Sequence, residues 1–147
     1  MKTRALLSTA LIAIVALAIA VPAVGQGLTI HWQIALRGNS AADWASAEYT
    51  FQASPSSKHV VTFSKFTVEA MTPNLPDGTR LGVFIGPSTS PDKPYGRQIG
   101  TISIEGGSGA MVMYGAKVPT VRKGTTVAVV YTDRVPNGNN ITLKGKF

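Results

Sequence analysis

The side chains able to carry out acid–base or metal chemistry are few and scattered along this chain. The sequence holds two histidines, His31 and His59, and no cysteine. A zinc site needs three or four converging ligands, and neither histidine has a Cys, Asp or Glu at metal-ligand spacing. We therefore expect no metal site, and nothing in the sequence indicates a cofactor.

Catalysis by paired carboxylates has one candidate in the sequence. Glycoside hydrolysis needs two acidic side chains that face each other across a cleft. Of the seven Asp and Glu residues, only Asp43 and Glu48 lie close together along the chain. No serine lies in a G-x-S-x-G elbow, and no nucleophile–base set is visible. The sequence thus favours a protein that is not an enzyme, with a small secreted hydrolase that uses Asp43 and Glu48 as the alternative.

Aromatic side chains beside basic residues are the better candidates for binding. Lys93 and Arg97 flank Tyr95 in an expected surface loop, and Trp44 lies in a second expected loop. Such rings stack on sugars or anchor a protein partner. We predict Trp44, Lys93, Tyr95 and Arg97 as binding residues. The alternative is that Trp44 covers one end of the core while Tyr95 is an isolated surface ring.

Short segments with an apolar residue at every second position must hold these side chains in place. The clearest is 28–37, LTIHWQIALR, in which alternate residues from Leu28 to Leu36 are apolar. This period predicts a β-strand with one buried face. Similar alternation predicts further strands at 47–53, 60–70, 81–85, 99–104, 111–118, 125–132 and 141–147.

Two segments interrupt this simple pattern. Within 60–70 the apolar residues change phase by one position, which predicts a β-bulge near Ser64 and Lys65. In the segment 40–48, Ser40 and Asp43 resemble a capping box, so this segment is either one or two turns of helix or a plain loop.

Glycine-rich turns separate the predicted strands. The strongest signals are Asp77-Gly78, the run from Gly106 to Gly109, and Asn137-Gly138. Eight or nine short strands divided by such turns predict an all-β fold. We expect an antiparallel β-sandwich, Ig-like or jelly-roll-like, that forms a single domain over 26–147.

The N-terminal segment is expected to be an export signal. Lys2 and Arg4 precede an apolar run at 5–20, and small residues lie just before Gln26. This arrangement predicts a leader helix in a signal peptide over 1–25, with cleavage before Gln26. The alternative is an uncleaved anchor, because residues 5–24 could cross a bilayer core of ~30 Å. A membrane contact is expected only in that case.

The charge of the chain is moderately basic. The formal net charge is +7, and loss of the two basic residues of the leader leaves about +5. Such a balance favours anionic polysaccharide as a partner. The basic residues are spread singly, so nucleic acid is not an expected partner. A cysteine-free exported chain must be stabilised by its core, since it has no disulfides.

Several short motifs resemble a loosely defined group of small exported bacterial β-sandwich proteins of unknown function. They are an LPDGT turn at 75–79, a G-T-I strand at 100–102, the Gly-rich hairpin at 106–109 and a VP-x-V-x-x-G segment at 118–124. The resemblance covers nearly all of 26–147. It implies a fold and an export address, and it implies no active site.

These observations favour a non-catalytic binding, adhesive or structural module that is extracellular, periplasmic or on the cell surface. A carbohydrate-binding module is the first alternative, ahead of a hydrolase or an outer-membrane β-barrel. An envelope protein is a further expected partner. The strand at 141–147, which carries Lys144 and Lys146, is expected at a sheet edge. There it could pair with a second copy of the chain by strand addition.

Overall fold

The computed structural model describes residues 28–53, 62–87, 94–131 and 142–147. Within these ranges the chain forms eight strands and one turn of 3-10 helix, η1. The elements are β1 (Leu28–Arg37), β2 (Trp44–Ala53), β3 (Thr62–Met71), β4 (Arg80–Ile85), β5 (Arg97–Ser103), β6 (Ser108–Tyr114), η1 (Gly115–Lys117), β7 (Thr126–Tyr131) and β8 (Thr142–Lys146). The all-β prediction is confirmed. The leader, Lys93, His59 and the Asn137-Gly138 turn lie outside the described residues.

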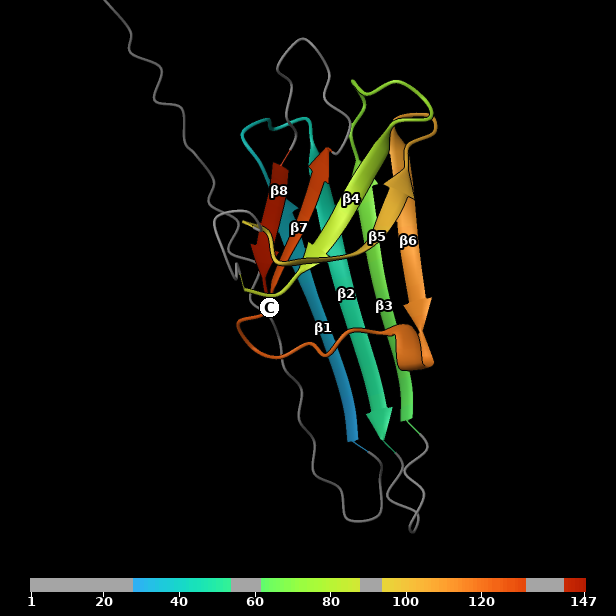
Figure 1. Ribbon diagram of the computed structural model, residues 1–147, viewed down its shortest axis with the longest axis vertical. Helices are drawn as coiled ribbons and strands as arrows, with labels where there is room; N and C mark the ends of the chain where they lie inside the picture. Colours follow the sequence, from blue (N-terminus) through green and yellow to red (C-terminus); the bar gives the residue numbers. More distant parts are fainter. Residues whose placement is uncertain (1–27, 54–61, 88–93, 132–141) are drawn as a thin grey trace, which may run out of the picture.

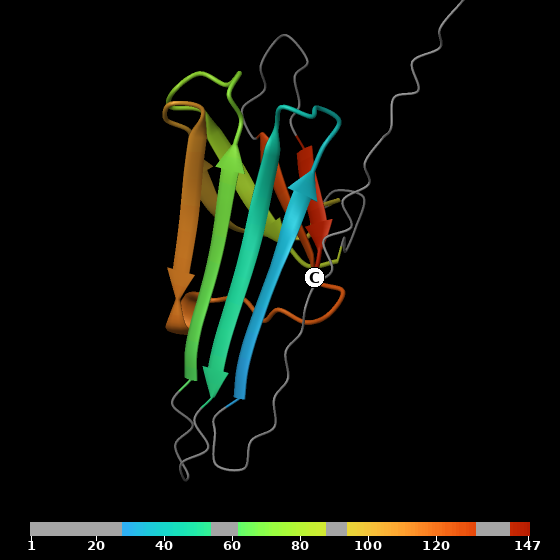
Figure 2. The same cartoon turned by 180° about the vertical axis from the view of Figure 1, so that it is seen from behind.

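All eight strands belong to one antiparallel sheet that nearly closes on itself. Its order is β5-β4-β7-β8-β1-β2-β3-β6. Figures 1 and 2 show that β4, β5, β7 and β8 lie across one side of the long strands β1, β2 and β3. The sheet therefore has an inner face that is shared by its two halves, and two outer faces that point away from each other.

The inner face holds the hydrophobic core that the two-residue period predicts. Leu36 of β1, Phe66 of β3 and Leu81 of β4 are fully buried. The Phe147 ring, which follows β8, packs against Trp32 and Phe66, with ring centroids 6.2 and 6.4 Å apart. Burial of each such side chain stabilises the fold by roughly 1.5–3 kcal/mol. The core therefore joins residues from both ends of the described chain.

Close backbone contact at two corners lets the sheet fold over. At the β1–β8 corner, a Cβ atom on Gly145 would lie 2.7 Å from the Ala35 carbonyl oxygen. At the β5–β6 corner, a Cβ atom on Gly109 would overlap the Ser103 carbonyl oxygen. Each corner needs a residue without a side chain, because the two strands approach more closely there than a methyl group allows.

The predicted bulge near Ser64 and Lys65 is wrong. β3 pairs with β2 in unbroken register from Thr62 to Met71. Phe63 caused the apparent change of phase: it lies on the outer face and is 45% exposed, whereas Phe66 is buried. The sheet does contain a register shift elsewhere, between Val83 and Phe84 of β4.

The structure also decides between the alternatives for residues 40–48. No helix forms in this segment: residues 40–43 form a short connection, and β2 begins at Trp44. The Ser40 hydroxyl oxygen accepts a hydrogen bond from the Ala42 backbone N–H at 3.2 Å. Ser40 therefore shapes a turn between β1 and β2 and does not cap a helix.

Two expectations for the C-terminal part of the chain need correction. The strand predicted at 111–118 ends at Tyr114, where Gly115 adopts φ +59° and η1 begins. The last strand was expected at a sheet edge, and this is wrong, since β8 lies between β7 and β1. Loss of β8 would divide the sheet.

Gly109 and Gly106 provide a matched test of the β5–β6 corner. We expect Gly109→Ala to lower the free energy of unfolding by about 2–3 kcal/mol, because the added methyl group overlaps the Ser103 carbonyl. Gly106 has φ +58° with nothing near its Cβ position. Asn tolerates this conformation, so Gly106→Asn should change stability by less than about 0.5 kcal/mol. Urea unfolding measures both, and an equal effect of the two substitutions would contradict this account.

Candidate functional site

One outer surface of the sheet carries most of the large apolar side chains that the described residues leave exposed. It consists of the outward-pointing residues of β1, β2, β3 and β6, and we call it the outer face. Its large apolar members are Trp44, Phe63, Met71, Val112 and Tyr114, which are 37–57% exposed. Large apolar side chains that gather on one exposed face favour a binding surface over a plain solvated surface.

The register of the strands fixes how these side chains are arranged. Trp44 of β2 lies directly opposite Met71 of β3, and Val112 of β6 lies opposite Thr67 of β3. Tyr114 lies opposite Lys65 of β3. Phe63 lies two residues before Lys65, on the same side of that strand. One apolar group, Trp44 with Met71, therefore lies at one end of the outer face. A second group, Phe63 with Tyr114, lies towards the other end, with Val112 between them.

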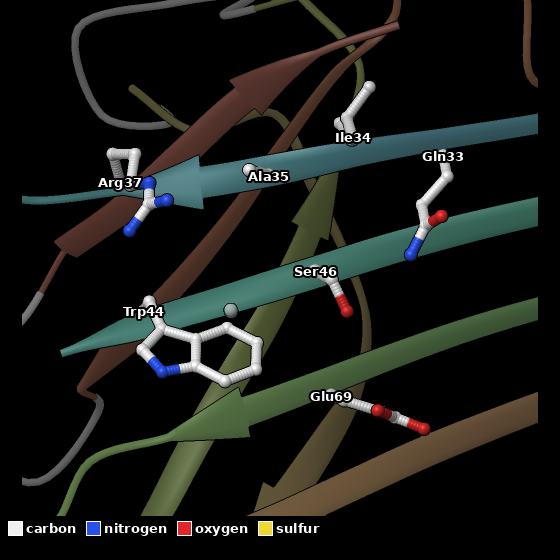
Figure 3. Close-up of a pocket in the computed structure, with 8 residues that line it drawn as sticks. Gln33, Ile34, Ala35, Arg37, Trp44, Ser46 and Glu69 are labelled. Carbon is white, nitrogen blue, oxygen red and sulfur yellow. The ribbon is translucent and has the colours of Figure 1, made fainter. Parts of the chain in front are cut away.

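A shallow depression of about 470 Å³ surrounds Trp44. Figure 3 shows the indole ring on the same side of the sheet as the side chains of Arg37, Ser46 and Glu69, which come from β1, β2 and β3. Gln33 of β1 also lines the depression. A flat aromatic ring can stack on an apolar face of a ligand. The amide, hydroxyl and charged groups beside it can contact the hydroxyl groups of the same ligand.

Polar residues occupy the middle of the outer face. The Nδ1 atom of His31 lies 3.1 Å from the Thr50 hydroxyl oxygen and 3.7 Å from a carboxylate oxygen of Glu48. Thr67 is only 8% exposed, and its hydroxyl has no hydrogen-bond partner among the described residues. Lys65 and Glu69 lie on β3 to either side of Thr67. The middle of the face thus carries both signs of charge.

Tyr95 lies on the opposite side of the molecule from Trp44. Its ring packs against Phe84 of β4 at 5.9 Å, and the Lys144 ammonium lies 4.7 Å from the ring centre. Phe84 and Lys144 point outward, because their neighbours Val83 and Leu143 are buried in the core. The structure therefore does not bring Trp44 and Tyr95 together.

Arg97 is also separate from Trp44. Arg97 is exposed at the start of β5, where it pairs with Ile85 of β4. Lys93 lies outside the described residues. Of the three predicted residues that the structure describes, Trp44 alone lies on the outer face.

The geometry does not support Asp43 and Glu48 as a catalytic pair. Glu48 points outward from β2, and Asp43 lies buried just before that strand. At about 3.3 Å per residue the two are separated by roughly 16 Å, which exceeds the spacing that glycosidases use.

Within 28–53, 62–87, 94–131 and 142–147, no group of three His, Cys, Asp or Glu side chains could hold a metal ion. Burial raises the pKa of the Tyr49 hydroxyl, so this phenol is neutral at physiological pH.

Sequence reasoning missed four of the five exposed apolar residues of the outer face. Phe63 contributed only to the change of phase within 60–70 that predicted a bulge, and Met71, Val112 and Tyr114 were not identified as a group. A signal was present for Phe63 and Met71, because their parity is opposite to that of the buried Phe66, Val68 and Ala70 once β3 is read without a bulge. The pairing of β6 with β3 then places the groups together, and it cannot be read from the sequence.

Comparison with known proteins gives no match: no family model, no curated protein and no solved structure is similar to this chain. The part of the chain that the structure describes contains no helix with the length and hydropathy needed to cross a membrane.

The two tryptophans should respond differently to truncation. Trp32 packs against Tyr49 and Phe147, so Trp32→Ala should lower the free energy of unfolding by about 3 kcal/mol or more. Trp44 projects from the outer face, so Trp44→Ala should cost less than about 1 kcal/mol. Thermal unfolding followed by circular dichroism measures both. A cost for Trp44→Ala as large as that for Trp32→Ala would show that Trp44 serves the fold rather than a binding surface.

Proposed function

We propose that this protein is an exported, non-catalytic β-sandwich that acts as a binding, adhesive or structural module in the envelope or outside the cell. The observation that carries the proposal is the outer face, on which Trp44, Phe63, Met71, Val112 and Tyr114 are exposed together. A soluble protein gains nothing in stability from such a surface and risks aggregation through it. Contact with another molecule accounts for this arrangement.

A sandwich of two four-stranded halves is favoured over a barrel by the pairing at the two corners. β1 and β8 share a single residue pair, Arg37 with Lys144. β5 and β6 are joined near their turn by one bridge, Glu105 with Ser108. The strands inside each half pair over five or more positions. Such weak corners suit two packed layers, whereas a barrel needs continuous pairing around its circumference.

Export is supported by the sequence of residues 1–25 and by the resemblance to small exported bacterial β-sandwich proteins. The positive start, the apolar run and the small residues before Gln26 suit a signal peptidase substrate.

Mass spectrometry of the protein expressed from its complete coding sequence in a bacterial host tests this part of the proposal. We expect a soluble product that begins at Gln26. A product that retains Met1 and stays in the cytoplasm would contradict export, and one that retains Met1 in the membrane fraction would favour the uncleaved anchor.

Carbohydrate binding is the second candidate function, and the depression around Trp44 favours it. The indole ring offers a flat apolar surface for a sugar ring, and Gln33, Ser46 and Glu69 offer hydrogen-bonding groups beside it. Arg37 would also suit an anionic polysaccharide.

A glycan array tests this candidate with a matched pair of variants. Binding should be lost in Trp44→Ala and retained in Tyr114→Ala, since both rings lie on the outer face but only Trp44 lines the depression. Equal loss in both variants would place the ligand elsewhere on the face. The absence of any signal from the folded protein would eliminate carbohydrate binding.

A further inference from the structure

The outer face has the pattern that self-association requires. A two-fold symmetric dimer uses the same patch on both chains, so the patch must be complementary to itself when it is turned around. The outward residues of β3, in order, are Phe63, Lys65, Thr67, Glu69 and Met71. Reversal of this series places an apolar residue on an apolar residue at both ends and a basic residue on an acidic residue beside the centre.

The neighbouring strands extend this complementarity across the sheet. We take the level of Thr67 and Val112, which pair between β3 and β6, as the position of a two-fold axis that runs across the strands. Tyr114 of β6 would then face Ala110 of the second chain. On β2, Trp44 would face the aliphatic part of Gln52. Large side chains thus meet small or flexible ones on both strands.

Glu48 is the one residue at this level that would face a like charge. It pairs with Thr67 in register, so it lies beside the axis on β2. Its carboxylate is drawn along the face towards His31, 3.7 Å away within its own chain.

Charge and area both favour a second copy of the chain as the occupant. Without the two basic residues of the leader the formal net charge is about +5, so two copies repel each other through most of their surface. On the outer face, in contrast, Arg37 and Lys65 are balanced by Glu48 and Glu69. With strands about 4.8 Å apart and 3.3 Å per residue, the face measures roughly 19 Å by 30 Å. This footprint of about 570 Å² is roughly seven-tenths of the ~800 Å² of accessible surface that each partner buries in a standard interface, so the dimer needs the whole face.

We propose that two copies of this chain associate face to face through the outer face, with Lys65 of each chain paired to Glu69 of the other. This dimer covers the depression around Trp44, so self-association and carbohydrate binding compete for the same face. It replaces pairing through β8, which lies inside the sheet between β7 and β1.

Charge reversal tests the proposed pairing. Lys65→Glu and Glu69→Lys each place like charges opposite one another, so each should weaken the dimer about tenfold or more. The double variant restores opposite charges and should recover the dimer. Sedimentation equilibrium of the exported product measures all four proteins without any ligand, so a negative glycan array has no bearing on the result. A wild-type protein that stays monomeric at high micromolar concentration would overturn the proposal, as would a double variant that fails to recover.

Cross-linking gives a second readout that does not depend on the charged variants. The chain has no cysteine, so a single Val112→Cys substitution introduces one unique thiol. Because Val112 lies at the level of the axis, it should face its own copy across the gap of about 10 Å between packed sheets. A short bis-maleimide should link Val112→Cys chains much faster than Lys123→Cys chains, in which the thiol lies in the exposed turn before β7. Equal rates for the two variants would overturn the proposal.

Discussion

Close approach of backbones at two corners is the constraint on which the rest of this structure depends. A single sheet of eight strands can enclose a core only if it turns back on itself, and the turn occurs where β1 meets β8 and where β5 meets β6. Gly145 and Gly109 lie at these points, and each lacks the space for even a methyl group. Leu36, Phe66 and Leu81 are all buried in the one core that the two halves enclose.

The same constraint creates the outer face. Once the two halves pack together, the inward residues of β1, β2 and β3 are buried in the core, and most of the outward residues remain at least partly exposed. A plain solvated surface would carry charged and polar groups there, yet Trp44, Phe63 and Met71 occupy these positions. The site and the fold are therefore two sides of the same strands, and a substitution on one side leaves the other largely unchanged.

The sequence predicted the strands well because their signal is local. The alternation in 28–37 gives the buried side of β1, and the Asp77-Gly78 turn lies where Gly78 has φ +84°. It could not predict which strands pair across long distances, since β6 reaches β3 and β8 reaches β1 only through tertiary packing. This is why β8 was expected at an edge, and why the outward position of Phe63 was taken for a bulge. The prediction of the candidate site was incomplete for the same reason. Trp44 was identified, but the exposed apolar residues of β3 and β6 come onto the same face only when the strands pair.

The position of β8 has a consequence for how this protein folds during its synthesis. Residues 142–146 join β7 to β1, so the two halves of the sheet have no common ladder until this last described strand has been synthesised. During most of its synthesis on the ribosome, the chain therefore has separate groups of strands whose apolar faces are not yet buried. Pairing between such distant segments is slow to find its register, which places folding in the range of milliseconds to seconds. Until then, chaperones that hold nascent chains would meet a polypeptide whose sheet is still open.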